Sequence, residues 1–159
     1  MMKQSKQHGF SMVEVLVTLV IMAVGLLGLA GMQATSLRNT ESAYQRSQAA
    51  QMAYDMLDRM RVNAAGVAAG GYNSIDETAP TSYTSCLKAD TTSTCTTAQM
   101  TAFDDGDWHA KLAAALPLGT GSVAGGGTGS VFTITVRWDD NRDGSVTIAD
   151  ASFTLSSLL

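Results

Sequence analysis

The chain has 159 residues, of which 45% are hydrophobic and 15% are charged, and its formal net charge is −4 at pH 7. That length suits one modest domain. A net negative charge argues against a nucleic-acid partner, because proteins hold nucleic acids largely through basic contacts to phosphates. The hydrophobic residues are concentrated near the N-terminus, where residues 10–32 contain a single charge, Glu14.

A short basic segment precedes this apolar run. It contains Lys3 and Lys6, and the next Lys or Arg after the run is Arg38. About 20 apolar residues are enough for a helix to span a bilayer. Positive charge on one side of the span predicts a cytoplasmic N-terminus and a periplasmic remainder. A secretory signal peptide and a permanent membrane anchor are the two simpler alternatives.

Glu14 is the residue that neither simpler alternative explains. A carboxylate inside a spanning helix costs about 2.5–3.5 kcal/mol on insertion scales. No Lys or Arg lies within one or two helical turns of it inside the run. We therefore expect its partner to be a positive charge on another molecule, or one newly created on this chain.

The residues from Gly9 to Leu19, GFSMVEVLVTL, resemble the prepilin leader motif of the type IV pilin-like family. The resemblance implies that prepilin peptidase cuts between Gly9 and Phe10 and N-methylates Phe10. It also implies that Glu14 of an incoming subunit neutralises the Phe10 amine of its neighbour, since a paired buried charge is tolerable where a single one is not.

A helical pattern continues beyond the apolar run. No proline interrupts residues 10–62, and the glycines from Gly66 onward supply stop signals. The sequence predicts one helix of roughly 50 residues, or about 80 Å at 1.5 Å per residue. Residues 10–32 are its membrane or filament-core half, and residues 33–63 are its amphipathic half.

Two features of this helix leave alternatives open. Gly25, Gly28 and Gly31 fit either close helix packing in the membrane or a stretch that unwinds when the subunit enters a filament. Asp55 and Arg59 can pair at i,i+4, although a solvated helix face is the simpler interpretation.

The remainder, residues 64–159, is expected to be a small α+β head. Cys86 and Cys95 lie in an irregular Thr/Ser-rich stretch, residues 66–99. With no further Cys or His nearby they make a poor zinc site, and a short-loop disulfide in an oxidising compartment is predicted. Two unrelated free thiols are the alternative.

A second helix is predicted to begin at Asp104 or Asp105 and to end before Pro117. Trp108 should anchor it in the core, while His109 should be an exposed polar residue. After it, residues 119–130 suggest a glycine-rich linker.

Alternation of apolar and polar residues then predicts a small antiparallel sheet. The apolar positions are Phe132, Ile134, Val136, Trp138, Val146, Ile148, Phe153 and Leu155.

An acidic turn interrupts this alternation. Asp139, Asn141, Asp143 and Asp150 have the spacing of positions 1, 3, 5 and 12 of an EF-hand calcium loop, with Asp in place of the final Glu. The turn also resembles the calcium loops of dockerin modules. Strand-like flanks favour a hairpin turn instead, for which Asp, Asn and Gly are needed on backbone grounds alone. Ca²⁺ is the only cofactor expected.

Three further segments resemble one pilin subfamily, the type IV pilus modification proteins (PilV type): residues 26–33, residues 53–63 and the pattern around Trp108. The resemblance implies an α+β type IV pilin fold with a leader at residues 1–9. It implies a minor pilin that initiates pilus (fimbrium) assembly and lies near the tip. Its expected partners are prepilin peptidase, the major pilin, other minor pilins, the inner membrane and, as a further candidate, a tip adhesin.

Two other classes of function were weighed against this one. A minor pseudopilin of a type II secretion system shares the N-terminal motif and the fold, and a membrane-anchored calcium-binding envelope protein is a weaker alternative. An enzyme is not expected, because the sequence has no Ser-His-Asp, Cys-His or metal-hydrolase spacing and keeps only His109 after leader removal.

Overall fold

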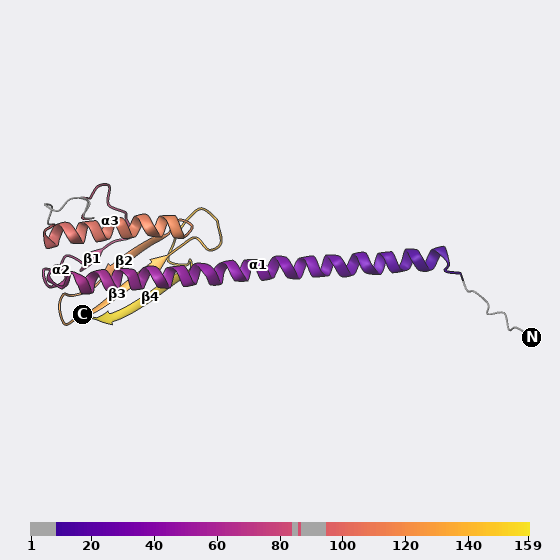
Figure 1. The fold of residues 1–159 in the computed structure, drawn as a ribbon, viewed down its shortest axis with the longest axis horizontal. Coiled ribbons are helices and arrows are strands. Elements are labelled where there is room, and N and C mark those ends of the chain that lie inside the picture. Colours follow the sequence, from indigo (N-terminus) through magenta and orange to yellow (C-terminus); the bar gives the residue numbers. More distant parts are fainter. Residues whose placement is uncertain (1–8, 84–85, 87–94) are drawn as a thin grey trace, which may run out of the picture. The chain divides into compact units, whose positions relative to one another are not determined.

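The computed structural model describes residues 9–83, 86 and 95–159 (Figure 1). The chain divides into two compact units, Met1–Glu41 and Ser42–Leu159. The first helix, α1, runs from Met12 to Val62 and contributes to both units. This confirms the prediction of one long N-terminal helix without a proline break.

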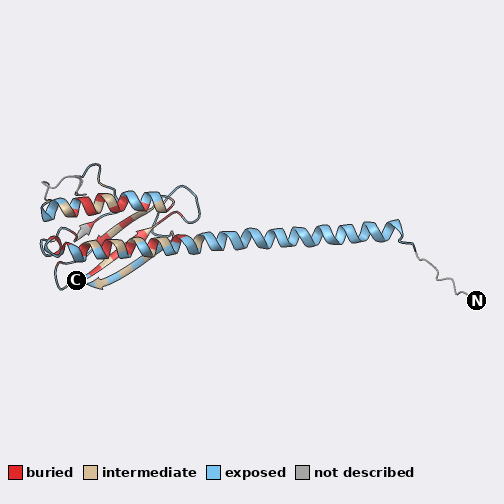
Figure 2. Ribbon diagram, viewed as in Figure 1, coloured by how far each residue is buried: buried red, intermediate tan, exposed pale blue. Residues whose placement is uncertain are grey.

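In the first unit, α1 begins immediately after Ser11. The backbone N–H of Glu14 donates to Ser11 Oγ at 3.2 Å, so Ser11 satisfies one of the free donors of the first turn. From Met12 to Glu41 every side chain is exposed (Figure 2). The helix in this unit is therefore formed by local propensity alone, without an internal core.

In the second unit, α1 buries one stripe of side chains. Ala49, Ala53, Met56, Leu57 and Met60 recur every three or four residues and are buried. The spacing places them on one face of the helix, which packs on the head.

The described residues of the second unit form six further elements (Figure 1). They are α2 (Ala64–Ala68), β1 (Ser74–Ile75), α3 (Thr97–Ala115), β2 (Thr120–Ala124), β3 (Val131–Arg137) and β4 (Ser152–Leu158). The strands form one antiparallel sheet in the order β1-β2-β3-β4. The α+β class and the antiparallel sheet are as predicted.

One face of the sheet carries the core. Phe132, Ile134 and Val136 alternate along β3 and are buried, and Trp138 follows at the end of the strand. They form one cluster with the buried stripe of α1 and with Trp108 and Leu112 of α3. Burying each side chain of this size contributes about 1.5–3 kcal/mol relative to exposure. Trp108 is fully buried, as expected of a core anchor.

The start of the second helix was predicted wrongly. Helix α3 begins at Thr97, and Thr96 is its N-cap in a capping box with Gln99. A Thr-x-x-Gln box satisfies two backbone donors at once and so starts the helix about two turns before Asp104 and Asp105. Its end at Ala115, before Pro117, agrees with the prediction.

The glycine-rich segment also differs from the expected linker. Residues Thr120–Ala124 form β2, which pairs with β3 in register from Thr120–Arg137 to Ala124–Thr133. Gly121 lies against Trp108, and a Cβ on it would come within 2.4 Å of the indole ring. The small residues of this strand therefore make room for the core.

Val146 and Ile148 do not belong to a strand. They lie in the loop between β3 and β4, and Ile148 is 92% exposed. Two apolar residues spaced two apart suggested a strand there. The loop is instead held by hydrogen bonds from backbone N–H groups to the carboxylates of Asp139 and Asp150, and not by backbone pairing between strands.

Candidate assembly site

The predicted cleavage bond lies just outside the helix. Gly9 and Phe10 precede α1, and Phe10 is 85% exposed. A Cβ built on Gly9 would meet nothing within 4 Å. No contact in the described part of the chain therefore requires glycine at this position.

Glu14 lies in the first turn of α1 with an exposed side chain. Its carboxylate has no ion-pair partner among residues 9–83, 86 and 95–159. The first turn favours a negative charge through the helix dipole, but only weakly when the site is exposed. The carboxylate is thus available to a cation from outside the described chain.

The segment that follows Glu14 presents a continuous apolar surface. The helix is long and apolar enough near the N-terminus to cross a membrane. Its one hydroxyl in this stretch, that of Thr18, donates to the carbonyls of Glu14 and Val15, so it is satisfied within the helix. A Cβ built on Gly25, Gly28 or Gly31 would meet nothing within 4 Å. Both interpretations of these glycines, close helix packing in the membrane and unwinding in the filament, therefore stay open.

In the head, a cluster of charges joins α1 to α3. Arg59 pairs with Asp55 at 3.0 Å, with Asp107 at 2.5 Å and with Asp104 at 3.4 Å, and Lys111 pairs with Asp107 at 3.0 Å. The Arg59 side chain is only 14% exposed. The solvated face considered for Asp55 and Arg59 is therefore wrong. Burial opposes ionisation of Asp107, but Arg59 and Lys111 outweigh it and lower the pKa of Asp107.

Asp104 has a structural role rather than a capping one. Its carboxylate accepts a hydrogen bond from the hydroxyl of buried Tyr72 while pairing with Arg59. Asn63 donates to the same hydroxyl at 3.0 Å. Burial and the bond to Asp104 raise the pKa of Tyr72. Sequence reasoning missed this network because nothing local marks Asp104 as buried.

His109 is buried, contrary to the prediction of an exposed residue, with 3% of its surface accessible. Its Nδ1 lies 3.0 Å from the carbonyl oxygen and 2.9 Å from Oδ1 of Asp105, and its Nε2 lies 3.1 Å from the carbonyl oxygen of Gly121. Both ring nitrogens face acceptors, and only the imidazolium donates from both. Burial lowers the pKa of His109, but the bonds to Asp105 and Gly121 outweigh it and raise that pKa overall.

The two cysteines are joined, as predicted. Cys86 and Cys95 form a disulfide, and no other cysteine exists in the chain. The bridge closes a loop of this length at a contribution of about 2–3 kcal/mol in the chain-entropy picture. The bond favours an oxidising compartment for the head.

The acidic loop brings the predicted ligands close together but uses them internally. Both carboxylate oxygens of Asp139 accept backbone N–H groups, from Asp143 at 3.1 Å and Gly144 at 2.9 Å. The amide of Asn141 donates to Asp143 at 3.0 Å and lies 3.5 Å from Asp150. No group of three or more His, Cys, Asp or Glu side chains in the described residues is arranged to hold a metal. Calcium binding stays a prediction.

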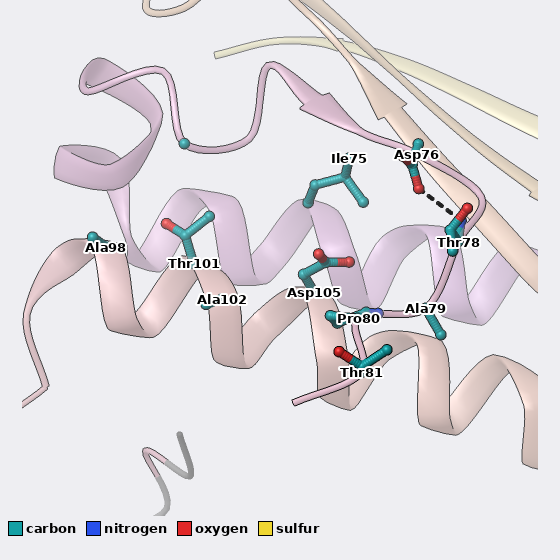
Figure 3. A pocket seen from close by; sticks show the side chains of 11 residues that line it. Ile75, Asp76, Thr78, Ala79, Pro80, Thr81, Ala98, Thr101, Ala102 and Asp105 are labelled. Atoms are coloured by element: carbon teal, nitrogen blue, oxygen red, sulfur yellow. Dashed lines mark hydrogen bonds between the residues drawn. The ribbon is translucent and has the colours of Figure 1, made fainter. Parts of the chain in front are cut away.

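An open cavity of about 600 Å³ lies beside α3 (Figure 3). Its polar lining includes Asp76, Asp105 and several threonines. The Asp76 carboxylate accepts the N–H of Thr78 at 2.7 Å, and Asp105 pairs with His109. Both carboxylates of this lining are thus engaged, and the cavity presents no nucleophile beside a base. It offers no argument for catalysis.

Two family models match the chain. One, described as the prokaryotic N-terminal methylation motif, matches residues 4–30 and includes Gly9, Phe10 and Glu14. The other, described as type IV pilin Tt1218, matches residues 31–105, which hold the second part of α1 and the disulfide. No curated protein and no solved structure matches the chain.

The two matches adjoin and run from the leader to the middle of α3. The long helix followed by a small antiparallel sheet agrees with the α+β fold implied by the second match. That match names the Tt1218-like family, so the narrower resemblance to PilV-type proteins stays a prediction.

Proposed function

Because the chain belongs to the type IV pilin-like family, whose members are structural subunits made with a prepilin leader, we propose that it is a minor pilin. It is made as a single-pass inner-membrane precursor with a cytoplasmic leader and a periplasmic head. After processing it helps to initiate assembly of a type IV pilus and enters the filament near the tip. Lys3 and Lys6 ahead of the span and the Cys86–Cys95 bridge beyond it support this orientation.

Processing creates the charge that Glu14 lacks. Prepilin peptidase hydrolyses the amide between Gly9 and Phe10, so that water gives a carboxylate on Gly9 and an ammonium group on Phe10. A methyl donor then replaces one N–H proton of Phe10 by a methyl group, and the nitrogen keeps its ability to carry a positive charge. The new cation lies at the same end of α1 as Glu14.

The observation that carries the proposal is this carboxylate, which has no ion-pair partner among the described residues, on the apolar and exposed N-terminal part of α1, residues 12–32. Left alone in the membrane it costs about 2.5–3.5 kcal/mol. Paired with the Phe10 ammonium of a neighbouring subunit it becomes tolerable, and the same pairing leaves no charge alone in the filament. The pairing favours assembly over the isolated membrane state and fixes the axial position of the subunit.

The test compares Glu14→Val with Glu14→Asp and a matched control, Thr18→Val. The control removes a polar group one turn further along but no charge. We expect Glu14→Val to insert normally and to lose entry into filaments, Glu14→Asp to be intermediate because its reach is shorter, and Thr18→Val to assemble as the parent does. The measurement is the ratio of filament-associated to membrane-resident protein, with cleavage followed separately.

Normal assembly of Glu14→Val would contradict the pairing. Mass spectrometry of sheared pili is a second test of the proposal. We expect the chain to be present at low copy number, with N-methylated Phe10 as its first residue. If the chain is instead absent from pili and its deletion stops protein secretion, it is a pseudopilin of a type II secretion system.

A further inference from the structure

The outer edge of β4 is open. Strand β4 ends the sheet order, and no described segment pairs with its far side. The pairing with β3 includes the bonds Trp138 N–H to Ala151 O and Leu159 N–H to Ser130 O, both 3.3 Å. Hydrogen bonding in an antiparallel pair alternates, so the residues between these positions that bond to β3 are the odd-numbered ones. The N–H and C=O groups of four residues therefore face outward: Ser152, Thr154, Ser156 and Leu158.

Among the described residues, this edge lacks the charges, proline and bulge that often prevent strand addition. Natural proteins protect an edge with charged residues, proline, a bulge or a very short strand. Residues 152–158, SFTLSSL, contain no charge and no proline. Their register with β3 is continuous from Ser152–Arg137 to Leu158–Val131, so the described strand has no bulge.

The core is also incomplete along this edge. Every second residue of β3 is buried, whereas the residues of β4 alternate between half-buried and exposed (Figure 2). Phe153, Leu155 and Leu159 pack against the core on one side and remain partly exposed. A further strand beside β4 would cover these side chains as well as satisfy the backbone groups.

We propose that the outer edge of β4 receives an extended, uncharged segment of another protein as a fifth strand. The chemistry of the two faces defines the segment. It has apolar side chains at alternate positions, which continue the core beside Phe153 and Leu155, and small polar ones between them, which continue the hydroxyl-rich outer face formed by Thr133, Thr135 and Thr154.

A second copy that pairs its own β4 with this edge does not fit, an exclusion that rests on the proposed function. Strand β4 runs in the same general direction as residues 42–62 of α1 (Figure 1). Antiparallel pairing of two β4 strands would direct the two helices oppositely, although subunits anchored in one membrane direct them alike. Parallel pairing would place the helices on opposite faces of the joined sheet, so that both could not face one filament core.

The test uses the full chain in cells that make pili, with the photo-crosslinking residue benzoylphenylalanine at position 156 or at position 133. Ser156 is on the edge, and Thr133 is its register partner one strand further in. We expect position 156 to cross-link to one extended segment of a different pilus-associated protein, identified by mass spectrometry of the joined peptides, and position 133 to give no adduct.

A backbone variant then tests strand addition itself. Thr154→Pro removes a donor that faces outward and leaves the ladder to β3 intact, whereas Thr154→Ala keeps the donor. We expect about a tenfold or larger loss of the adduct at position 156 with Thr154→Pro and none with Thr154→Ala, since one backbone bond to a buried strand is worth about 1.4 kcal/mol. An unchanged melting temperature shows that the head is folded. If the melting temperature of the Thr154→Pro variant falls, Thr154→Lys is used instead. That variant keeps the backbone donor and adds a charge to the edge.

Three results would overturn the proposal: an adduct to a second copy of this chain, no adduct at position 156, or an adduct that survives the Thr154 substitution in a head that stays folded. Failure of the pilin assignment itself is distinguished separately, because it would appear as absence of the chain from sheared pili whatever the cross-linking shows.

Discussion

The two parts of α1 belong to one helix but have opposite environments. From Met12 to Glu41 every side chain is exposed, while from Ala49 to Met60 one stripe is buried in the core (Figure 2). Glycines show the same contrast: nothing lies near Gly9, whereas Gly121 lies against Trp108. The chain's own packing therefore constrains the buried residues of the second unit but not the described residues of the first.

The substitution Gly9→Val should have the largest effect of the changes considered. We expect it to block cleavage, because a branched side chain cannot enter a peptidase site built for a residue without a side chain, and to leave the melting temperature of the head unchanged. Immunoblots that separate precursor from mature chain measure the first, and near-UV circular dichroism of the two buried tryptophans measures the second. Intact-mass data showing residues 1–9 retained in assembled filaments would contradict the assignment of the cleavage site.

The same substitution at Gly121 should have the reverse effect. A Cβ there comes within 2.4 Å of Trp108 and 2.9 Å of Leu112, so Gly121→Val overpacks the core. We expect a loss of about 1–3 kcal/mol in the free energy of unfolding, with cleavage at Gly9 unaffected. A melting temperature equal to that of the parent chain would mean that β2 moves aside at little cost.

The contrast also explains which features the sequence could predict. The leader, the apolar run and Glu14 are contiguous, and their pattern needs no folded partner, so they were recognised directly. The long helix and the disulfide were likewise local. The start of α3 was missed because a capping box at Thr96 outweighs the acidic residues that follow it.

What the sequence could not predict lies where distant segments meet. The burial of His109 depends on the carbonyl of Gly121, in a strand that looks like a linker. The cluster around Arg59 needs α3 to lie against α1, with Asp104 and Asp107 on the facing side. The open edge of β4 follows from the strand order, which alternation alone does not give.

His109 predicts that the stability of the head depends on pH. The folded pKa of His109 is raised, so its contribution to stability is complete below the ordinary value of about 6.5 and is lost as pH rises through the folded value. We expect the melting temperature to fall between about pH 6 and pH 8 in the parent chain.

The matched variant is His109→Gln, which removes the titration and should melt with little pH dependence over that range. The lowered pKa of Asp107 and the raised pKa of Tyr72 act outside it. Both chains are compared after leader removal, because His8 lies in the leader. A parent chain whose melting temperature rises from pH 6 to pH 8 would show that His109 is neutral in the fold.

The acidic loop between β3 and β4 belongs to the head but shares the exposure of the first unit. It is largely exposed, and its sequence predicts a calcium ligand set of Asp139, Asn141, Asp143 and Asp150. The loop already satisfies its own backbone donors with these oxygens. Calcium would therefore replace hydrogen bonds rather than fill a site without partners, and binding should be weak.

Weak binding has a small but measurable consequence. A ligand that binds only the folded state stabilises it by RT ln(1 + [L]/Kd), which is about 0.4 kcal/mol when calcium equals a dissociation constant in the millimolar range. We expect the melting temperature to rise slightly with millimolar calcium and not with the same concentration of magnesium. Asp143→Asn should abolish the rise, while Asp58→Asn, which removes the same charge from an exposed position on α1, should preserve it. If the parent chain melts identically in calcium and in a chelator, the loop owes its sequence to its own turn.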